Sequence, residues 1–242
     1  MMRSMKVTTK TVAGGMIAGL MIAAGSAMAQ PTVLYSNIAS SPTSDVPGLA
    51  GAKFAPGATS SFRLDRLFVS PDGSRYILST LTNLPTSEDE AVIVGTFGGS
   101  ATVVAREGTA MPATTIAGSN YAFIRTQMGI NDAGDYAFSS DTNAAAASDE
   151  VVVAFDAGTG LFSLAAREGQ PIGSTGFNAG SVLNAVHVLQ DGSVRFRSTS
   201  GSGATLKDLL IDDGAVLAES DAFTPTGQLV APDQTMNSFA TD

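Results

Sequence analysis

Short apolar runs recur along the chain between about Phe62 and Asp221, and glycine, aspartate or asparagine residues separate them. The runs are short and rich in β-branched and aromatic side chains. These features favour strands over helices, and no sustained helical period with caps occurs after Ala29. The pattern therefore predicts an all-β fold.

Two sequence landmarks recur in constant register, which indicates a tandem repeat. The first is an octet, "SPDGSRYI", "NDAGDYAF" and "LQDGSVRF", whose glycines Gly73, Gly134 and Gly192 are almost evenly spaced. The second is "VVAREG" or "LAAREG", whose final glycine follows the octet glycine at the same distance in both copies. The repeat period is therefore about 60 residues.

Each unit is expected to contain four antiparallel strands, and the octet turn joins the first two. The expected strands are, in order within each unit, 66–70, 126–130 and 184–188; 74–80, 135–140 and 193–199; 91–97, 150–156 and 208–212; and 101–107, 161–168 and 215–219. Four-stranded units in tandem predict a β-propeller or a propeller-like stack of about three full blades.

Further strands are expected near both ends of the repeated region. One is "PTVLYSN" at Pro31–Asn37, and another lies in "TGQLVAP" or "MNSFATD". These terminal strands can share one incomplete blade, which would close a ring of at most four blades. An open array, or a chain cut short of its full number of repeats, are the alternatives.

The octet predicts a tight hairpin turn. A type I turn followed by a left-handed residue suits Gly73, Gly134 and Gly192, because glycine adopts that conformation without steric cost. In "NDAG", the side chain of Asn131 can also bond its own backbone. The residues two and four positions after each glycine share one strand face and are expected to point into the core. They are Arg75 and Ile77, Tyr136 and Phe138, and Val194 and Phe196, and Arg75 breaks the apolar pattern.

The octet of the middle unit resembles the NxxGxxAF repeat of bacterial exported tandem-repeat proteins grouped as "choice-of-anchor". The matching residues are Asn131, Gly134, Ala137 and Phe138, and the outer units replace the asparagine with Ser70 and Leu189. The resemblance covers the repeated region. It implies a secreted, propeller-like repeat protein without an established activity.

The segment from Met1 to Ala29 has the parts of a secretory signal peptide. It comprises a basic start, an apolar run at Val12–Ala24 and small residues before a cleavage site after Ala29. The apolar run is clearly shorter than the roughly 20 residues that span a bilayer, which favours cleavage over an uncleaved anchor. We therefore predict a protein in the periplasm or outside the cell. The expected organisation is a signal peptide at 1–29, an N-terminal strand and linker at 30–61, three repeats of one all-β domain at 62–232, and a tail at 233–242.

The charge of the chain limits its partners. Loss of the signal peptide takes the formal net charge from −9 to about −12. An acidic surface repels nucleic acid and anionic membranes, so neither is an expected partner. The chain has no cysteine, so burial and strand pairing must hold the fold without disulfides. No membrane span is expected after signal removal.

Histidine and cysteine chemistry is not expected. The sole histidine, His187, lies between valines in an expected strand, where a packing or surface role is the usual one. The sequence has no nucleophile elbow, metalloprotease helix motif, phosphate-binding loop or dinucleotide-binding loop. One histidine and no cysteine make zinc and haem sites unexpected.

Carboxylates are the abundant reactive groups. Glu107 and Glu168 recur at one position per unit, each directly after an arginine. They are the candidates for an acid pair of a glycosidase, which would require their carboxyl groups to lie about 5 to 10 Å apart. The alternative is structural, with Arg106–Glu107 and Arg167–Glu168 closing the last strand of each blade.

Acidic loops and linking loops are the remaining candidates. The acidic runs at 87–90 and 148–150 precede equivalent strands, and "DD" occurs at 212–213. Oxygen ligands suit calcium, but none of the runs matches a calcium-loop motif. The weak calcium candidates are Glu88, Asp89, Glu90, Asp149 and Glu150. The linking loops at 109–122 and 170–183 contain glycine, serine, threonine, asparagine and tyrosine, which can recognise sugars or peptides.

These observations predict an exported, non-enzymatic repeat protein that acts as a binding or structural module of the cell envelope or matrix and needs no cofactor. Its partner would be an envelope protein or a polysaccharide. A secreted glycan hydrolase on a propeller scaffold is the alternative. Oligomerisation through unpaired edge strands is a third possibility.

Overall fold

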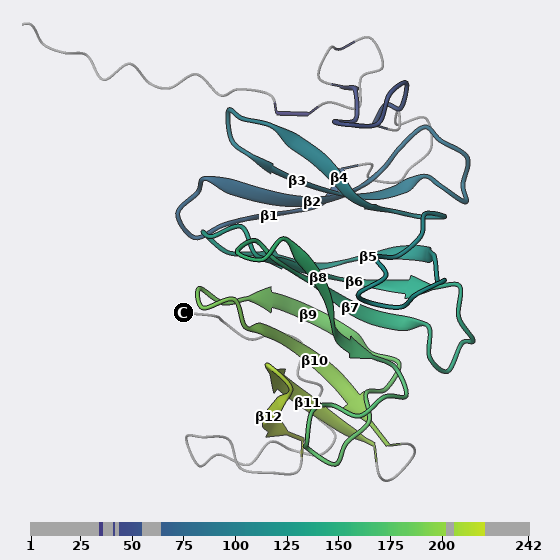
Figure 1. Cartoon of the computed structure of the whole chain (residues 1–242), viewed down its shortest axis with the longest axis vertical. Coiled ribbons are helices and arrows are strands. Elements are labelled where there is room, and N and C mark those ends of the chain that lie inside the picture. Colours follow the sequence, from purple (N-terminus) through teal and green to yellow (C-terminus); the bar gives the residue numbers. More distant parts are fainter. Residues whose placement is uncertain (1–33, 36–40, 42–43, 55–63, 202–205, 221–242) are drawn as a thin grey trace, which may run out of the picture. The chain divides into compact units, whose positions relative to one another are not determined.

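In a computed structural model of the chain, the structure describes residues 34–35, 41, 44–54, 64–201 and 206–220. These residues form three four-stranded antiparallel sheets, each built from strands that are consecutive in the sequence (Figure 1). The strands are β1 (Leu64–Val69), β2 (Arg75–Leu81), β3 (Glu90–Thr96), β4 (Ala101–Arg106), β5 (Tyr121–Ile130), β6 (Tyr136–Thr142), β7 (Glu150–Asp156), β8 (Leu161–Arg167), β9 (Leu183–Val188), β10 (Val194–Ser200), β11 (Lys207–Asp212) and β12 (Ala215–Glu219).

The predicted fold class is confirmed. Each unit has the expected four strands, in the order β1-β2-β3-β4, β5-β6-β7-β8 and β9-β10-β11-β12. Consecutive four-stranded antiparallel sheets that pack face to face are a propeller-like arrangement. The expected terminal strands at Pro31–Asn37 and beyond Asp221 lie largely outside the described residues. Among the described residues, no helix is long and apolar enough to cross a membrane.

The second sheet is buried on both of its faces, and β7 shows how. Val151 and Val153 pack into a cluster with the first sheet, whereas Val152 packs into a cluster with the third sheet. All three valines are fully buried. A strand with two buried faces needs apolar residues at successive positions, which explains the continuous hydrophobic runs of the third strands.

The three octet turns have the backbone that the hairpin requires. Gly73, Gly134 and Gly192 have φ values of 74°, 97° and 86°. In the first unit, however, Val69 pairs with Tyr76, whereas Ile130 pairs with Tyr136 in the second. The first turn is therefore one residue longer.

This extra residue corrects the predicted alignment of the strand faces. Leu78, not Ile77, corresponds to Phe138. Leu78 pairs with Ile93 of β3, and Phe138 pairs with Val153, the equivalent residue of β7. Arg75 is the first residue of β2, directly after the turn, and its Nε donates a hydrogen bond to the carbonyl of Asp132, at 3.0 Å. The apparent break in the apolar pattern is thus a contact between the turns of the first two units.

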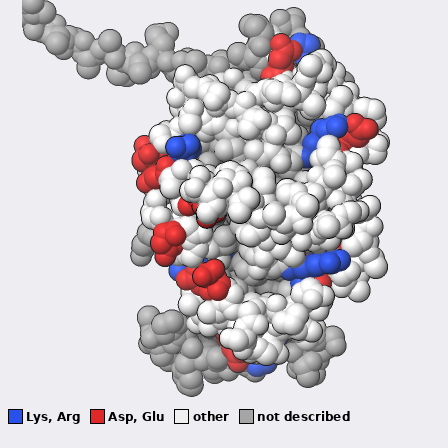
Figure 2. Space-filling model, viewed as in Figure 1, with Lys and Arg blue, Asp and Glu red and all other residues white. Residues whose placement is uncertain are grey.

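On the face that Figure 2 shows, the charged groups are not gathered in one patch. Figure 2 shows that the acidic and basic side chains on one face lie mainly along its sides, while uncharged residues cover the middle. Among the described residues visible on that face, the basic side chains form no continuous surface.

Candidate functional site

The structure places Glu107 and Glu168 at equivalent positions, directly after β4 and β8, and each lies beside an aspartate of its own unit. Burial, and then the charge of Asp89, raise the pKa of Glu107, which shares a hydrogen bond with that aspartate. Burial and a hydrogen bond with Asp149 likewise raise the pKa of Glu168. The two glutamates therefore form separate carboxyl pairs within their own units.

The neighbouring arginines do not pair with these glutamates as the sequence suggested. Arg106 forms its ion pair with Glu88, one of the calcium candidates. Arg167 donates from Nε to the carbonyl oxygen of Ser148 at 2.9 Å. Both arginines thus tie the fourth strand to the acidic turn that precedes the third strand.

Two further calcium candidates, Glu90 and Glu150, join neighbouring units. Glu90 accepts a hydrogen bond from the backbone N–H of Ile124 in β5. Glu150 accepts one from the backbone N–H of Leu183 in β9, at 2.9 Å. Each glutamate begins the third strand of one sheet and holds the first strand of the next, so the two contacts are equivalent. Among the described residues, no three or more histidine or acidic side chains form a group that could hold a metal ion.

These two carboxyl groups are poorly solvated. Glu150 is only 3% exposed, and burial raises its pKa to about 7 despite the opposing effects of the Leu183 N–H and Arg125. Burial likewise raises the pKa of Glu90 to about 7, against the hydrogen bond from Ile124. Each of these carboxyl groups nevertheless accepts a backbone hydrogen bond from the next unit, and this hydrogen bond holds it in place.

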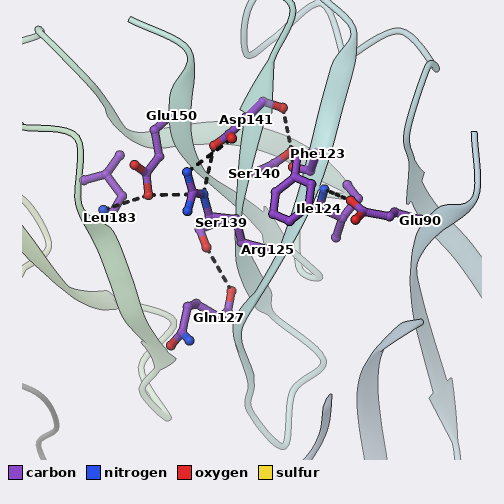
Figure 3. Close-up of polar contacts among 10 residues, drawn as sticks. All are labelled: Glu90, Phe123, Ile124, Arg125, Gln127, Ser139, Ser140, Asp141, Glu150 and Leu183. Atoms are coloured by element: carbon purple, nitrogen blue, oxygen red, sulfur yellow. Dashed lines mark hydrogen bonds and ion pairs between the residues drawn. The ribbon is translucent and has the colours of Figure 1, made fainter. Parts of the chain in front are cut away.

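The clearest departure from the repeat is a bulge in β5. Ile124 pairs with Ser140 and Met128 with Phe138, so that residues 125–127 are left opposite a single residue of β6. A bulge bends the strand and redirects its side chains. Here it directs the side chain of Arg125 into a polar cluster (Figure 3).

Arg125 is held by two acidic side chains. Its Nε lies 2.8 Å from Asp141 Oδ1 and its Nη2 lies 3.2 Å from Asp141 Oδ2. Its Nε also lies 3.5 Å from Glu150 Oε1. Although burial opposes the charged form, Asp141 and Glu150 raise the pKa of Arg125. The guanidinium carbon lies 5.8 Å from the centre of the Phe123 ring, which is 46% exposed.

A second bulge lies opposite the first, in β9. Asn184 pairs with Arg197 and His187 with Arg195, which leaves one extra residue in β9. Ala185 in this bulge has a φ of 50°, a conformation that costs a non-glycine residue roughly 1–2 kcal/mol. Its N–H donates to Gln127 Oε1 at 3.1 Å, so a side chain of the first bulge holds the strained residue of the second.

An open cavity of about 330 Å³ lies between the β5 bulge and the start of β9. It is lined by Phe123, Arg125, Thr126, Gln127, Glu150, Ser181, Val182 and Asn184. Ser181 and Val182 come from the linking loop at 170–183, one of the two loops expected to take part in recognition. The Oδ1 atom of Asn184 is buried and has no hydrogen-bond partner in the described part of the chain.

His187 takes a packing position in β9. It is half-buried, and burial followed by the charge of Arg195 lowers its pKa. It is not among the residues that line the cavity.

The bulge site was not identified from the sequence. The expected first strand of the second unit began at Thr126, whereas β5 begins at Tyr121. The available signal was the polar triplet Arg125–Gln127 between two apolar segments, "FI" and "MGI". Such a triplet interrupts the alternation of a strand and indicates extra residues.

Comparison with known proteins gives a family but no assigned activity. A family model described as a family of unknown function (DUF7453) matches residues 24–239. No curated protein matches the chain. Among solved structures, the crystal structure of TolB from Acinetobacter baumannii is similar over 70% of this chain and 37% of that one, with 15% sequence identity and a TM-score of 0.37. The chain thus spans less than half the length of TolB, and a similarity at this level carries no conclusion about function.

Proposed function

The chain belongs to the family of unknown function DUF7453, and we propose that it is an exported, non-enzymatic binding or structural module of the cell envelope or extracellular matrix. The observation that carries the proposal is how the repeat uses its carboxyl groups. Glu90 and Glu150 hold the first strand of the next unit, and Glu88 holds Arg106. Acidic groups engaged in this way support a scaffold more than a catalytic centre.

The carboxyl pairs give little support to a glycan hydrolase. In each pair the two groups share a hydrogen bond, Glu107 with Asp89 and Glu168 with Asp149. Glycosidase carboxyls lie about 5 to 10 Å apart, because a sugar or a water must fit between them. Contact between the two groups leaves no such space within either pair, and the predicted pair of Glu107 with Glu168 remains the alternative that the variant below tests.

Export is part of the proposal, with signal-peptide cleavage after Ala29. It is supported by the basic start, the short apolar run and the small residues before the cleavage site. We also propose kinship with the NxxGxxAF repeat proteins. Asn131, Gly134, Ala137 and Phe138 support this kinship, because they form the turn and the buried start of β6. The proposed partner is an envelope protein or a polysaccharide, and the outer edges of β4, β8 and β12 are candidate surfaces for self-association.

The test is co-sedimentation of the purified chain with insoluble envelope and matrix fractions, together with an assay for released reducing ends. We expect saturable co-sedimentation and no release of sugar. The Glu107→Gln/Glu168→Gln variant should bind as the wild type does. A chain that stays in the supernatant with every fraction, or a sugar release that this variant abolishes, would contradict the proposal.

A further inference from the structure

We propose that the facing bulges of β5 and β9 form a binding site for a neutral carbohydrate. This inference rests on the proposed binding function and names its ligand. The site comprises Phe123, Arg125 and Thr126 from β5, Ser181 from the loop that leads into β9, and Asn184 from β9 itself.

The local backbone is more elaborate than sheet pairing requires. In β5, residues 125–127 lie opposite one residue of β6, which is a longer bulge than those in β1 and β9. Ala185 is held at a positive φ across from this bulge. Bulges and strained residues are frequent at functional sites, where they direct side chains away from regular pairing.

The cavity has the size and lining of a small-ligand site. Its volume of about 330 Å³ lies at the lower end of the roughly 300–1,000 Å³ that ligand pockets occupy. The exposed ring of Phe123 supplies an apolar surface, as Figure 3 shows beside Arg125. The remaining lining is mostly polar, which is the mixture that an amphipathic sugar ring matches.

The charges favour a neutral ligand. The cation of Arg125 is already bound by Asp141 in two hydrogen bonds and faces Glu150 at 3.5 Å. An anion would meet these two carboxyl groups, and a cation would have to displace Arg125 from them. A neutral ligand with hydroxyl groups is not repelled by the carboxyl groups and does not have to displace Arg125.

The unsatisfied Asn184 oxygen supports a hydrogen-bond donor in the ligand. Asn184 Oδ1 is buried and without a partner in the described part of the chain, and Asn184 lines the cavity. A buried acceptor left unpaired costs about 1–3 kcal/mol, so a turn of the Asn184 amide that brings this oxygen to the cavity and to a sugar hydroxyl would be favourable. The side-chain hydroxyls of Thr126 and Ser181, which also line the cavity, can donate or accept.

The experiment is titration calorimetry of the whole chain with four probes: a neutral hexose disaccharide, an N-acetylhexosamine disaccharide, a hexuronate disaccharide and a lysine tripeptide. We expect at least one neutral saccharide to bind and the two charged probes not to bind. Phe123→Ala and Asn184→Leu should each weaken that binding about tenfold or more, the loss of one good contact.

A matched control separates the site from general effects. Phe97 is 44% exposed and follows β3 of the first sheet, so Phe97→Ala should change affinity less than about twofold. Asn184→Leu removes an unpaired buried oxygen, and its unfolding midpoint should therefore not fall. This variant tests the site without a loss of folding.

Three outcomes would overturn the inference. They are binding of a charged probe alone, no binding of either neutral saccharide, and equal loss in Phe97→Ala and Phe123→Ala. If the chain still co-sediments with envelope fractions, any of these outcomes would reject the carbohydrate site, and the proposed binding module would stand. Loss of co-sedimentation with saccharide binding retained would contradict the envelope module instead.

Discussion

Asn131 joins the octet turns of the second and third units through one side chain. Its Oδ1 accepts hydrogen bonds from the N–H groups of Gly134 and Asp135, both at 2.9 Å. Its Nδ2 donates to Asp135 Oδ2 and to the carbonyl of Leu189, at 2.7 and 2.9 Å. Ser70 plays part of this role in the first unit, since its Oγ accepts from the N–H of Arg75.

Asn131→Ala should therefore destabilise the chain by about 1–3 kcal/mol, because it leaves buried backbone groups without partners. Asn131 is fully buried. The exposed Asn143, whose Oδ1 accepts one bond from the N–H of Asn120, is the matched control. Asn143→Ala should cost about 1 kcal/mol or less. Denaturant midpoints would check both, and equal losses would contradict a special role for Asn131.

A second residue-scale prediction concerns Gly129, at the contact between β5 and β9. A Cβ atom there would lie 2.9 Å from both His187 Cα and Val188 N. Gly129→Ala must push backbone against backbone and should cost about 1–3 kcal/mol. Gly158→Ala is the control, because its Cβ would meet only the end of the Asp156 side chain. Thermal unfolding of both variants would measure the difference, and similar midpoints would mean that β9 moves aside freely.

At the scale of the elements, Glu90 and Glu150 make the contact between sheets depend on pH. Their pKa is about 7 in the folded chain against an ordinary value of 4.5. A carboxyl with a raised folded pKa binds its proton more tightly in the folded state. Its contribution to stability is therefore complete below about pH 4.5 and is lost as the pH rises through 7.

Glutamine keeps the accepting oxygen and cannot titrate, so the Glu90→Gln/Glu150→Gln variant should remove this dependence. We expect the free energy of unfolding of the wild type to fall from pH 5 to pH 7.5 more steeply than that of the variant. The difference should be at most about 3 kcal/mol for each glutamate. Denaturant unfolding across this range would measure it, with each single variant expected to remove part of the slope. Parallel profiles for wild type and double variant would show that neither glutamate titrates in this range.

Over the whole molecule, local pattern predicted the strands but not the contacts between sheets. The continuous apolar run of β7 and the glycine turns are short-range signals, and they located all twelve strands. The partners of Glu90 and Glu150 are 34 and 33 residues away, and no local pattern specifies such a distance. The bulge in β5 could not be predicted for a related reason, because an alignment of the repeats assigns extra residues in one copy to a loop.

The arrangement of the sheets also predicts how unfolding spreads. Phe138 packs in the cluster between the first and second sheets, and Phe196 packs in the cluster between the second and third. Both are fully buried, so replacement by alanine should cost about 3–5 kcal/mol in each case. In an array where each unit contacts only its neighbours, such losses stay near their source.

Hydrogen exchange would show the spread directly. Phe196→Ala should raise the exchange of amides in β9–β12 most and leave those in β1–β4 nearly unchanged. Phe138→Ala should raise exchange most in β5–β8 and in β1–β4, because Phe138 packs between these two sheets, and less in β9–β12. A uniform rise over all three sheets in both variants would show a single cooperative unit, in which contacts beyond those between successive sheets couple the first unit to the third.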